Sequence, residues 1–247
     1  MNPPMPIYSK TIPRSDLTPA QVLEMFQLLA EHFDGVTQEE FSRDLMEKNR
    51  VILLLRDKRL VGFSTLLAYA ATFEGETLNV IFSGDTIVAP EAWGTTTLPR
   101  AWIAAVNEWR EQLPEGRCFW LLLTSGFRTY RFLPVFWREF FPRFDKPTPP
   151  QTQRLLQQLA REQFGVQFDS SAGVVRFNSP QKLRACLQEI PTGREHDPHI
   201  AFFLANNPGH VCGEELVCLT ELCDANLTRA GRRMIEPRHH ESLCGHC

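Results

Sequence analysis

The chain lacks two features that would decide its class at once, a long apolar run and a strong charge of one sign. No stretch approaches the about 20 apolar residues that cross a bilayer, and 26 basic against 29 acidic residues leave a net charge of −3. This balance gives no general attraction to nucleic acid or to an anionic membrane. Residues 1–14 are rich in proline and lack the apolar centre of a secretory signal. We therefore expect a cytoplasmic protein with neither a membrane span nor a nucleic-acid partner, and the sequence leaves its oligomeric state open.

The chain also has no complete disulfide or zinc pattern. Its seven cysteines are an odd number, which argues against a fully paired disulfide framework. Cys244 and Cys247 have the two-residue gap of a zinc knuckle, but the spacing of Cys212, Cys218 and Cys223 does not supply the other half. We therefore expect reduced thiols and no bound metal. A structural zinc site, in a zinc-stabilised interaction protein, is the alternative.

What the sequence does contain is the composition and periodicity of a globular α/β protein. Hydrophobic residues make up 43% of the chain and charged residues 22%. Thr18 is an N-cap candidate before an apolar stripe of helical spacing, and Thr37 with Glu40 forms a capping box. The predicted order is two helices (19–33 and 37–49), three strands (51–55, 60–69 and 78–88), a helix (97–113), a buried strand (118–123) and an aromatic segment (127–144).

Polar side chains interrupt the otherwise apolar strand at residues 78–88. Because side chains alternate between the two faces of a strand, Ser83 and Asp85 are predicted to share a face with Asn79, Ile81 and Ile87. Burying a carboxylate without a partner is costly, so Asp85 is expected to have a partner or a task. The alternative is that Ser83 and Asp85 lie at a solvated sheet edge or cap a loop.

The loop after this strand enters a helix and has the composition of an anion-binding turn. A helix N-terminus presents free N–H groups and the positive end of the helix dipole, which suits a pyrophosphate. Gly94 permits close approach of a ligand to the backbone, and Thr95, Thr96 and Thr97 add hydroxyl groups. Ordinary capping of a core helix explains the same residues, so that alternative stays open.

The ordered set of elements, together with Val88-Ala89-Pro90 at the end of the long strand, resembles the GNAT superfamily of N-acyltransferases over roughly residues 17–144. In that family the long strand ends in a Val-x-Pro element, and a loop that binds phosphate follows. Trp93 stands where the family usually has a basic residue or glutamine, and the later glycine is missing. This departure suits a carrier-protein donor, or a loop that uses threonine hydroxyls and backbone amides alone.

The resemblance implies an α/β (α+β) fold with a mixed, mostly antiparallel central sheet flanked by helices. Pro147, Pro149 and Pro150 mark the clearest break in the chain, so we expect an insertion after residue 145. The predicted divisions are an extended arm (1–18), a GNAT-like core (19–145), the insertion (146–195), a C-terminal helix and strand that complete the sheet (196–235) and a Cys/His-rich tail (236–247).

The resemblance also implies a reaction, the transfer of an acyl group from an acyl-CoA or acyl-carrier-protein thioester to an amine. Asp85 is the only acidic residue of the strand at 78–88, so it is the candidate base, with Ser83 beside it. Tyr130 is the candidate acid for the leaving thiolate, and packing in the core is its alternative. Arg128 is a candidate phosphate contact or, alternatively, a solvated charge. The residues assigned to the donor are Ile87, Val88, Gly94, Thr95, Thr96, Thr97 and Arg128.

Aromatic residues crowd the segment 127–144, and they predict either core packing or an apolar channel for an acyl chain. The residues assigned to this acyl-chain pocket are Phe82, Trp93, Trp102, Phe132 and Phe136. We prefer a medium or long acyl chain, moved to the amine of a small molecule, an amino acid or a peptide. The rival from another class is a non-catalytic binding module that has kept the fold.

Overall fold

The computed structural model describes residues 5–235 and has one eight-stranded central sheet. Its strand order is β1-β3-β4-β5-β6-β10-β8-β7, and every neighbouring pair is antiparallel except β5 and β6, which are parallel. The predicted mixed, mostly antiparallel sheet is therefore confirmed. The strands are β1 (Ile7–Pro13), β3 (Arg50–Arg56), β4 (Arg59–Phe73), β5 (Glu76–Val88), β6 (Cys118–Thr124), β7 (Phe168–Asp169), β8 (Val174–Val175) and β10 (Glu215–Glu221).

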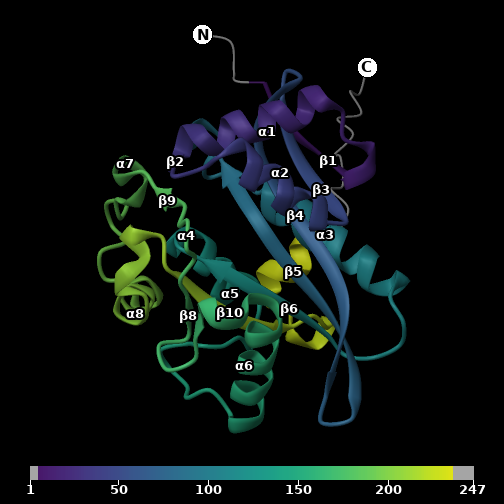
Figure 1. Cartoon of the computed structure of the whole chain (residues 1–247), viewed down its shortest axis with the longest axis vertical. Coiled ribbons are helices and arrows are strands. Elements are labelled where there is room, and N and C mark those ends of the chain that lie inside the picture. The colour runs from purple at the N-terminus through teal and green to yellow at the C-terminus, as the bar shows by residue number, and fades with distance from the viewer. Residues whose placement is uncertain (1–4, 236–247) are drawn as a thin grey trace, which may run out of the picture.

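Helices cover both faces of the sheet, as Figure 1 shows. One face carries α1 (Pro19–His32), α2 (Gln38–Glu47) and α6 (Pro150–Phe164). We call it the α6 face. The other, the α3 face, carries α3 (Thr97–Gln112), α4 (Phe127–Tyr130), α5 (Phe132–Phe136), α8 (Pro198–Asn206) and α9 (Arg229–Ile235). Within residues 5–235, no helix is long and apolar enough to cross a membrane.

The N-terminal arm of the predicted division forms part of the sheet. Residues 7–13 of the arm pair with β3 as an edge strand, because Pro6 and Pro13 stand only at its ends, where a missing N–H is tolerated. The tail at 236–247 lies outside the described residues, so the structure says nothing of Cys244 and Cys247.

The segment predicted as an insertion takes part in the sheet and in its core. Its helix α6 packs Leu155, Leu156 and Leu159 against residues of β6 and β10. Its strands β7 and β8 extend the sheet beyond β10. A third short strand, β9 (Lys182–Leu183), pairs with β2 (Phe33–Asp34), and α7 (Ala185–Gln188) follows it. These strands bring residues 165–195 to the same end of the sheet as α1 and α2.

The sheet opens between β5 and β6. The two strands pair from Asn79 with Cys118 to Ser83 with Leu122, and the pairing ends there. β5 continues to Val88 and β6 to Thr124, so the chains diverge while each remains a strand. β10 keeps its pairing with β6 up to Thr124, which leaves the opening on the β5 side alone.

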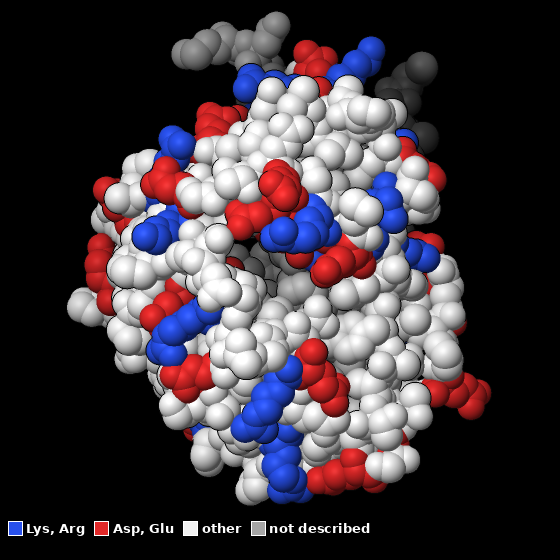
Figure 2. Space-filling view, in the orientation of Figure 1, with Lys and Arg blue, Asp and Glu red and all other residues white. Residues whose placement is uncertain are grey.

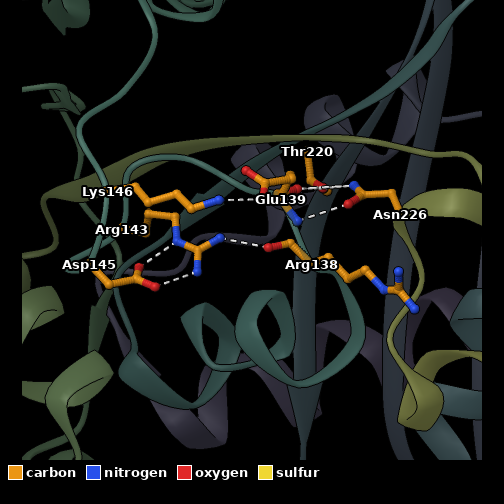
Figure 3. Close-up of polar contacts among 7 residues, drawn as sticks. All are labelled: Arg138, Glu139, Arg143, Asp145, Lys146, Thr220 and Asn226. Atoms are coloured by element: carbon orange, nitrogen blue, oxygen red, sulfur yellow. Dashed lines mark hydrogen bonds and ion pairs between the residues drawn. The ribbon is translucent and has the colours of Figure 1, made fainter.

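Asn226 fixes the extended segment that follows α5 against β10, as Figure 3 shows. Its amide donates hydrogen bonds to Glu139 O, to Thr220 Oγ1 and to Glu221 O at 3.0, 3.0 and 2.8 Å. Its Oδ1 accepts from the backbone N–H of Glu139 at 2.8 Å. A single buried side chain therefore satisfies the polar groups of two segments that are far apart in sequence.

We expect Asn226→Ala to lower the free energy of unfolding by about 3 kcal/mol, because truncation leaves several buried polar groups without partners. Urea unfolding followed by circular dichroism measures it. Lys146→Ala is the matched control, since its Nζ only pairs with the exposed Glu139 carboxylate at 2.6 Å, and such pairs contribute under about 1 kcal/mol. Equal losses in the two variants would contradict the central role of Asn226.

Candidate functional site

A cavity of about 1350 Å³ occupies the opening between β5 and β6 and receives side chains from both faces of the sheet. Leu98 and Trp102 reach it from the α3 face, and Phe82 and Phe164 reach it from the α6 face. The face of the molecule in Figure 2 is hollowed below α1 and α2. Because both sides contribute to one cavity, two ligands can enter from opposite faces and meet in the opening.

A β-bulge changes which side chains of β5 point to which face. The register with β4 shifts between Ser64 and Leu66, where Ser83 and Thr86 are the paired residues of β5. Ile81 packs in the core of the α3 face, but Ile87 packs in the core of the α6 face. The prediction that Asn79 through Ile87 keep one alternation was therefore wrong beyond Ser83, because an extra residue in one strand reverses the alternation.

Asp85 lies within this bulge and lines the cavity. No hydrogen bond or ion pair within residues 5–235 reaches its carboxylate. Desolvation, followed by the negative charge of Asp44, raises the pKa of Asp85 to about 7, against the opposing effect of Lys48. A carboxyl group with such a pKa exchanges protons near neutral pH, as a general base must.

A second carboxylate, that of Glu215 at the start of β10, faces the same cavity. Val217 and Leu219 pack with α6, and alternation places Glu215 on that face too. Desolvation and then the charges of Asp85 and Asp44 raise the pKa of Glu215 to about 8. The charge of Asp85 thus opposes the ionisation of Glu215.

Lys48 lies beneath the cavity wall with its side chain 1% exposed. Its Nζ contacts Asp44 Oδ1 at 2.5 Å and donates to the Asp44 carbonyl at 3.1 Å. A Cβ at position 84 would lie 2.6 Å from Lys48 Cε, so glycine lets β5 pass over the lysine. Lys48 is thereby held as a fixed positive charge near Asp85.

The backbone of β5 presents an N–H group to the opening. Ala89 N–H donates to Val61 O at 2.9 Å, and Ile87 pairs with Phe63. The backbone N–H and C=O groups of Ile87 and Ala89 therefore point toward β4. Alternation then directs the N–H and C=O of Val88 away from β4. The Val88 carbonyl accepts a hydrogen bond from Trp93 Nε1 at 2.8 Å. Of the two predicted residues, Val88 rather than Ile87 is therefore the one whose N–H faces a ligand.

The turn that leads into α3 leaves its amides without side-chain caps. Gly94 has a φ of 77°, which favours glycine, and a Cβ there would meet open space. The N-cap residue Thr96 makes no side-chain capping bond, and the Thr95 hydroxyl donates to Ala92 O. Gly94 and Thr95 line the cavity, whereas Thr96 and Thr97 contribute at most their backbone N–H groups.

Arg128 lines the cavity beside this turn. Its guanidinium stacks on Trp93 with 4.2 Å to the ring centroid and donates to the carbonyls of Leu187 and Glu189. It is therefore held in place, and is not the freely solvated charge that was the alternative. Arg131, which pairs with Asp197 at 3.0 Å, also lines this side.

Two of the predicted catalytic groups have other partners. The hydroxyl of Tyr130 donates to Pro142 O at 2.9 Å, and its fully buried ring packs against Phe202 and Phe203, outside the cavity. Burial raises the pKa of Tyr130. The hydroxyl of Ser83 accepts a hydrogen bond from Trp120 Nε1 at 2.9 Å. The assignment of Tyr130 as the acid is contradicted by this geometry, because an inward-packed aromatic ring cannot reach a ligand in the opening.

Most, but not all, of the residues predicted to form the acyl-chain pocket line the cavity. Phe82, Trp93, Trp102 and Phe132 line the cavity, but Phe82 does so from the α6 face, whereas Trp102 and Phe132 do so from the α3 face. Phe136 lies outside it and packs against Phe132 and Trp137. The position of Pro134 in the first turn of α5 lets the segment fold as two short helices rather than one, which turns Phe136 into the core.

Sequence reasoning missed Glu215, Asp44 and Lys48. The sequence signal for Glu215 was a charged residue at the first position of an apolar strand. Charged residues are common at strand ends, so this signal did not mark Glu215 as a functional residue. Helix α2 carries five charged residues, so nothing in the sequence separated Asp44 from its solvated neighbours.

Comparison with known families matches residues 15–131 to the Acetyltransferase (GNAT) domain. This part of the chain is a GNAT domain. The matched GNAT segment includes Asp85, Val88 and the turn before α3, but it ends before Glu215 and α6. A search of curated proteins found no match to the chain.

Several solved structures resemble the GNAT fold of this chain weakly. The GNAT family N-acetyltransferase YhbS from Escherichia coli, in complex with CoA, has 13% identity and a TM-score of 0.39, over 53% of this chain and 70% of that one. A probable N-acyltransferase from Enterococcus faecalis V583 has 13% identity and a TM-score of 0.43, over 89% and 66%. An aminoglycoside acetyltransferase from an uncultured soil metagenomic sample has 17% identity and a TM-score of 0.34, over 46% and 76%.

Proposed function

We propose that the protein is an N-acyltransferase that moves an acyl group from an acyl-CoA or acyl-carrier-protein thioester to an amine. The observation that supports this most is the position of Asp85, an unpaired carboxylate in the bulge where β5 separates from β6. The family match supports a transferase in general. The opening gives the thioester and the amine separate approaches to the same carboxylate.

The donor is proposed to bind on the α3 face. Its phosphates rest on the Gly94–Thr97 amides and near Arg128, where three arginines line this side. The thioester carbonyl accepts a hydrogen bond from the Val88 N–H, which stabilises the negative charge that develops on that oxygen. The donor end of the cavity thus supplies position and charge stabilisation.

The chemical step is proposed at the opening itself. The amine nitrogen attacks the thioester carbonyl carbon, and Asp85 accepts the proton that the nitrogen loses as the C–N bond forms. The C–S bond then breaks, and the thiolate takes a proton. Ser125, which directly follows β6 and lines the cavity, is our candidate in place of Tyr130 to pass a proton to the thiolate. Its hydroxyl regains that proton from water, and Asp85 gives its own proton back to water. The products are an amide and a free thiol.

Release of free thiol from octanoyl-CoA in the presence of a panel of amines tests the reaction. We expect amine-dependent release that Asp85→Asn removes and that Asp224→Asn leaves unchanged, since Asp224 pairs with Arg110 on the surface. A chain that binds CoA but releases no thiol with any amine, from CoA or carrier-protein donors, would be the non-catalytic module. The contact of Trp93 with the Val88 carbonyl is the observation that favours that rival.

We further propose a medium or long acyl chain, because the apolar side chains of Leu98, Trp102 and Phe132 line the cavity on the α3 face, where the donor is proposed to bind. Each buried methylene contributes about 0.8 kcal/mol. We therefore expect octanoyl-CoA to be used at least tenfold more efficiently than acetyl-CoA. Competition between the two donors for one amine measures this preference, and faster acetyl transfer contradicts it.

The zinc-stabilised alternative gains no support from the described residues. Within residues 5–235 no group of three His, Cys, Asp or Glu side chains is placed to hold a metal ion. Cys118, Cys186, Cys212, Cys218 and Cys223 are free thiols.

A further inference from the structure

The charged residues that line the cavity are segregated by sign. The α6 side carries five carboxylates, from Glu40, Asp44, Glu47, Asp85 and Glu215. The two cations on that side are Arg43 and Lys48, and Lys48 is already paired with Asp44. The α3 side carries Arg128, Arg131 and Arg194. Arg131 and Arg194 share the carboxylate of Asp197, whereas Arg128 donates to backbone carbonyls and keeps its charge for a ligand. An anionic donor on the arginine side therefore leaves the acidic side to a ligand of positive charge.

The floor of the acidic side is aromatic. Phe82 and Phe164 meet edge to face with ring centroids 5.7 Å apart, and Phe164 and Phe177 do so at 6.2 Å. All three rings line the cavity. Their edge-to-face arrangement leaves ring faces and edges for a further aromatic or apolar group.

The unpaired carboxylates lie at the inner end of this aromatic floor. Phe82 precedes the bulge that holds Asp85, and its ring lies 5.6 Å from Lys48 Nζ. Val166, which is fully exposed, stands at the outer edge beside Phe164. A ligand that lies along the floor thus meets carboxylates at its inner end and apolar surface along its length.

We infer that the acceptor is a primary amine carried on an aromatic or comparably bulky apolar body, and that it binds on the α6 side with its ammonium group at Asp85 and Glu215. This rests on the proposed function, because it assigns the acceptor of that reaction. The bound ammonium first gives one proton to the Glu215 carboxylate, and the neutral amine that remains attacks the thioester and gives its second proton to Asp85. A hydrophilic polyamine would satisfy the carboxylates but would leave the three rings in contact with water. A neutral aromatic compound would fill the floor but would leave both carboxylates without a partner.

Calorimetric binding without any thioester separates these ligand classes. We expect 2-phenylethylamine to bind at least tenfold more tightly than 2-phenylethanol, which lacks the charge, and than putrescine, which lacks the ring. Equal binding of the alcohol, or tighter binding of putrescine, overturns the inference.

Variants identify the two ends of the site. We expect Glu215→Gln to weaken the binding of 2-phenylethylamine at least fivefold without weakening the binding of 2-phenylethanol. We expect Phe164→Ala to weaken the binding of both compounds. The controls are Glu221→Gln, which removes a surface carboxylate paired with Arg117, and Phe144→Ala, which truncates a half-exposed ring outside the cavity. Equal effects of the control and test variants also overturn the inference.

The binding assay tests the acceptor site and the thiol-release assay tests the transferase reaction, so each proposal can be contradicted without the other. Binding of 2-phenylethylamine as expected, with no turnover of any thioester, supports the amine site and refutes the transferase. Turnover that prefers putrescine to 2-phenylethylamine leaves the transferase standing and overturns the acceptor class.

Discussion

Asp85→Asn should reduce the rate of acyl transfer by about 10²–10⁴-fold, because a positioned base contributes an effect of this size. The substitution keeps the shape of the side chain and removes its ability to accept the amine proton. It should leave the affinity for CoA unchanged, since the proposed donor contacts lie at Val88, the turn before α3 and Arg128. Thiol release gives the rate, and calorimetry gives the affinity for CoA.

The same variant should be more stable than the parent protein at pH 8. The folded protein holds the pKa of Asp85 near 7, above the ordinary 3.8 of aspartic acid, so folding favours the protonated form. Between those two values the folded state binds more protons than the unfolded state, and stability therefore falls as the pH rises. Removing the charge should restore roughly 1–2 kcal/mol at pH 8, a value discounted for the water that reaches the cavity.

Thermal unfolding at pH 5 and at pH 8 checks this stabilisation. The gain from Asp85→Asn should be clearly larger at pH 8 than at pH 5, because pH 5 lies near the lower end of the range between 3.8 and 7 over which the parent protein loses stability. Asp224→Asn, on the surface, should show no such gain. A variant that is both inactive and less stable than the parent at pH 8 would instead indicate a structural role for Asp85.

The rate should rise with pH through about 7 and level off above it, as Asp85 loses its proton. The acceptor for this measurement should be an aniline, whose amino group is attached directly to the ring and has a pKa below about 5. Its charge then stays constant across the pH range of the assay, so that groups of the protein determine the pH dependence. A rate that is constant from pH 5.5 to pH 8 would exclude a base with this pKa.

The two carboxyl groups should respond differently to loss of their partner. Asp85 titrates while Glu215 is still protonated, so Glu215→Gln should leave the step near 7 in place. The charge of Asp85 is one cause of the raised pKa of Glu215, so Asp85→Asn should lower the Glu215 pKa from about 8. Carbon-13 chemical shifts of the labelled carboxyl groups follow both sites directly. An unchanged Glu215 pKa in that variant would show that the pair is not coupled.

The sequence by itself determined the order of elements and one half of the site. The turn at Gly94 and an acidic residue within an apolar strand are local features of the sequence. The Val-Ala-Pro ending of the long strand carried the family resemblance that implied a role for Val88. That is why Asp85, Val88 and Gly94 could be predicted as site residues, and the structure places all three on the cavity.

Only the tertiary structure decided the other half. The bulge in β5 is a relation between two strands, so no pattern within β5 alone could show that Ile87 turns to the opposite face. Glu215 lies 130 positions after Asp85 and meets it only because β10 pairs with β6. Tyr130 fits the expected place in the sequence, but the packing of α4 against α8 turns its hydroxyl toward Pro142. Pairing between strands and packing between helices depend on contacts between distant segments, and these contacts fixed which groups share the cavity.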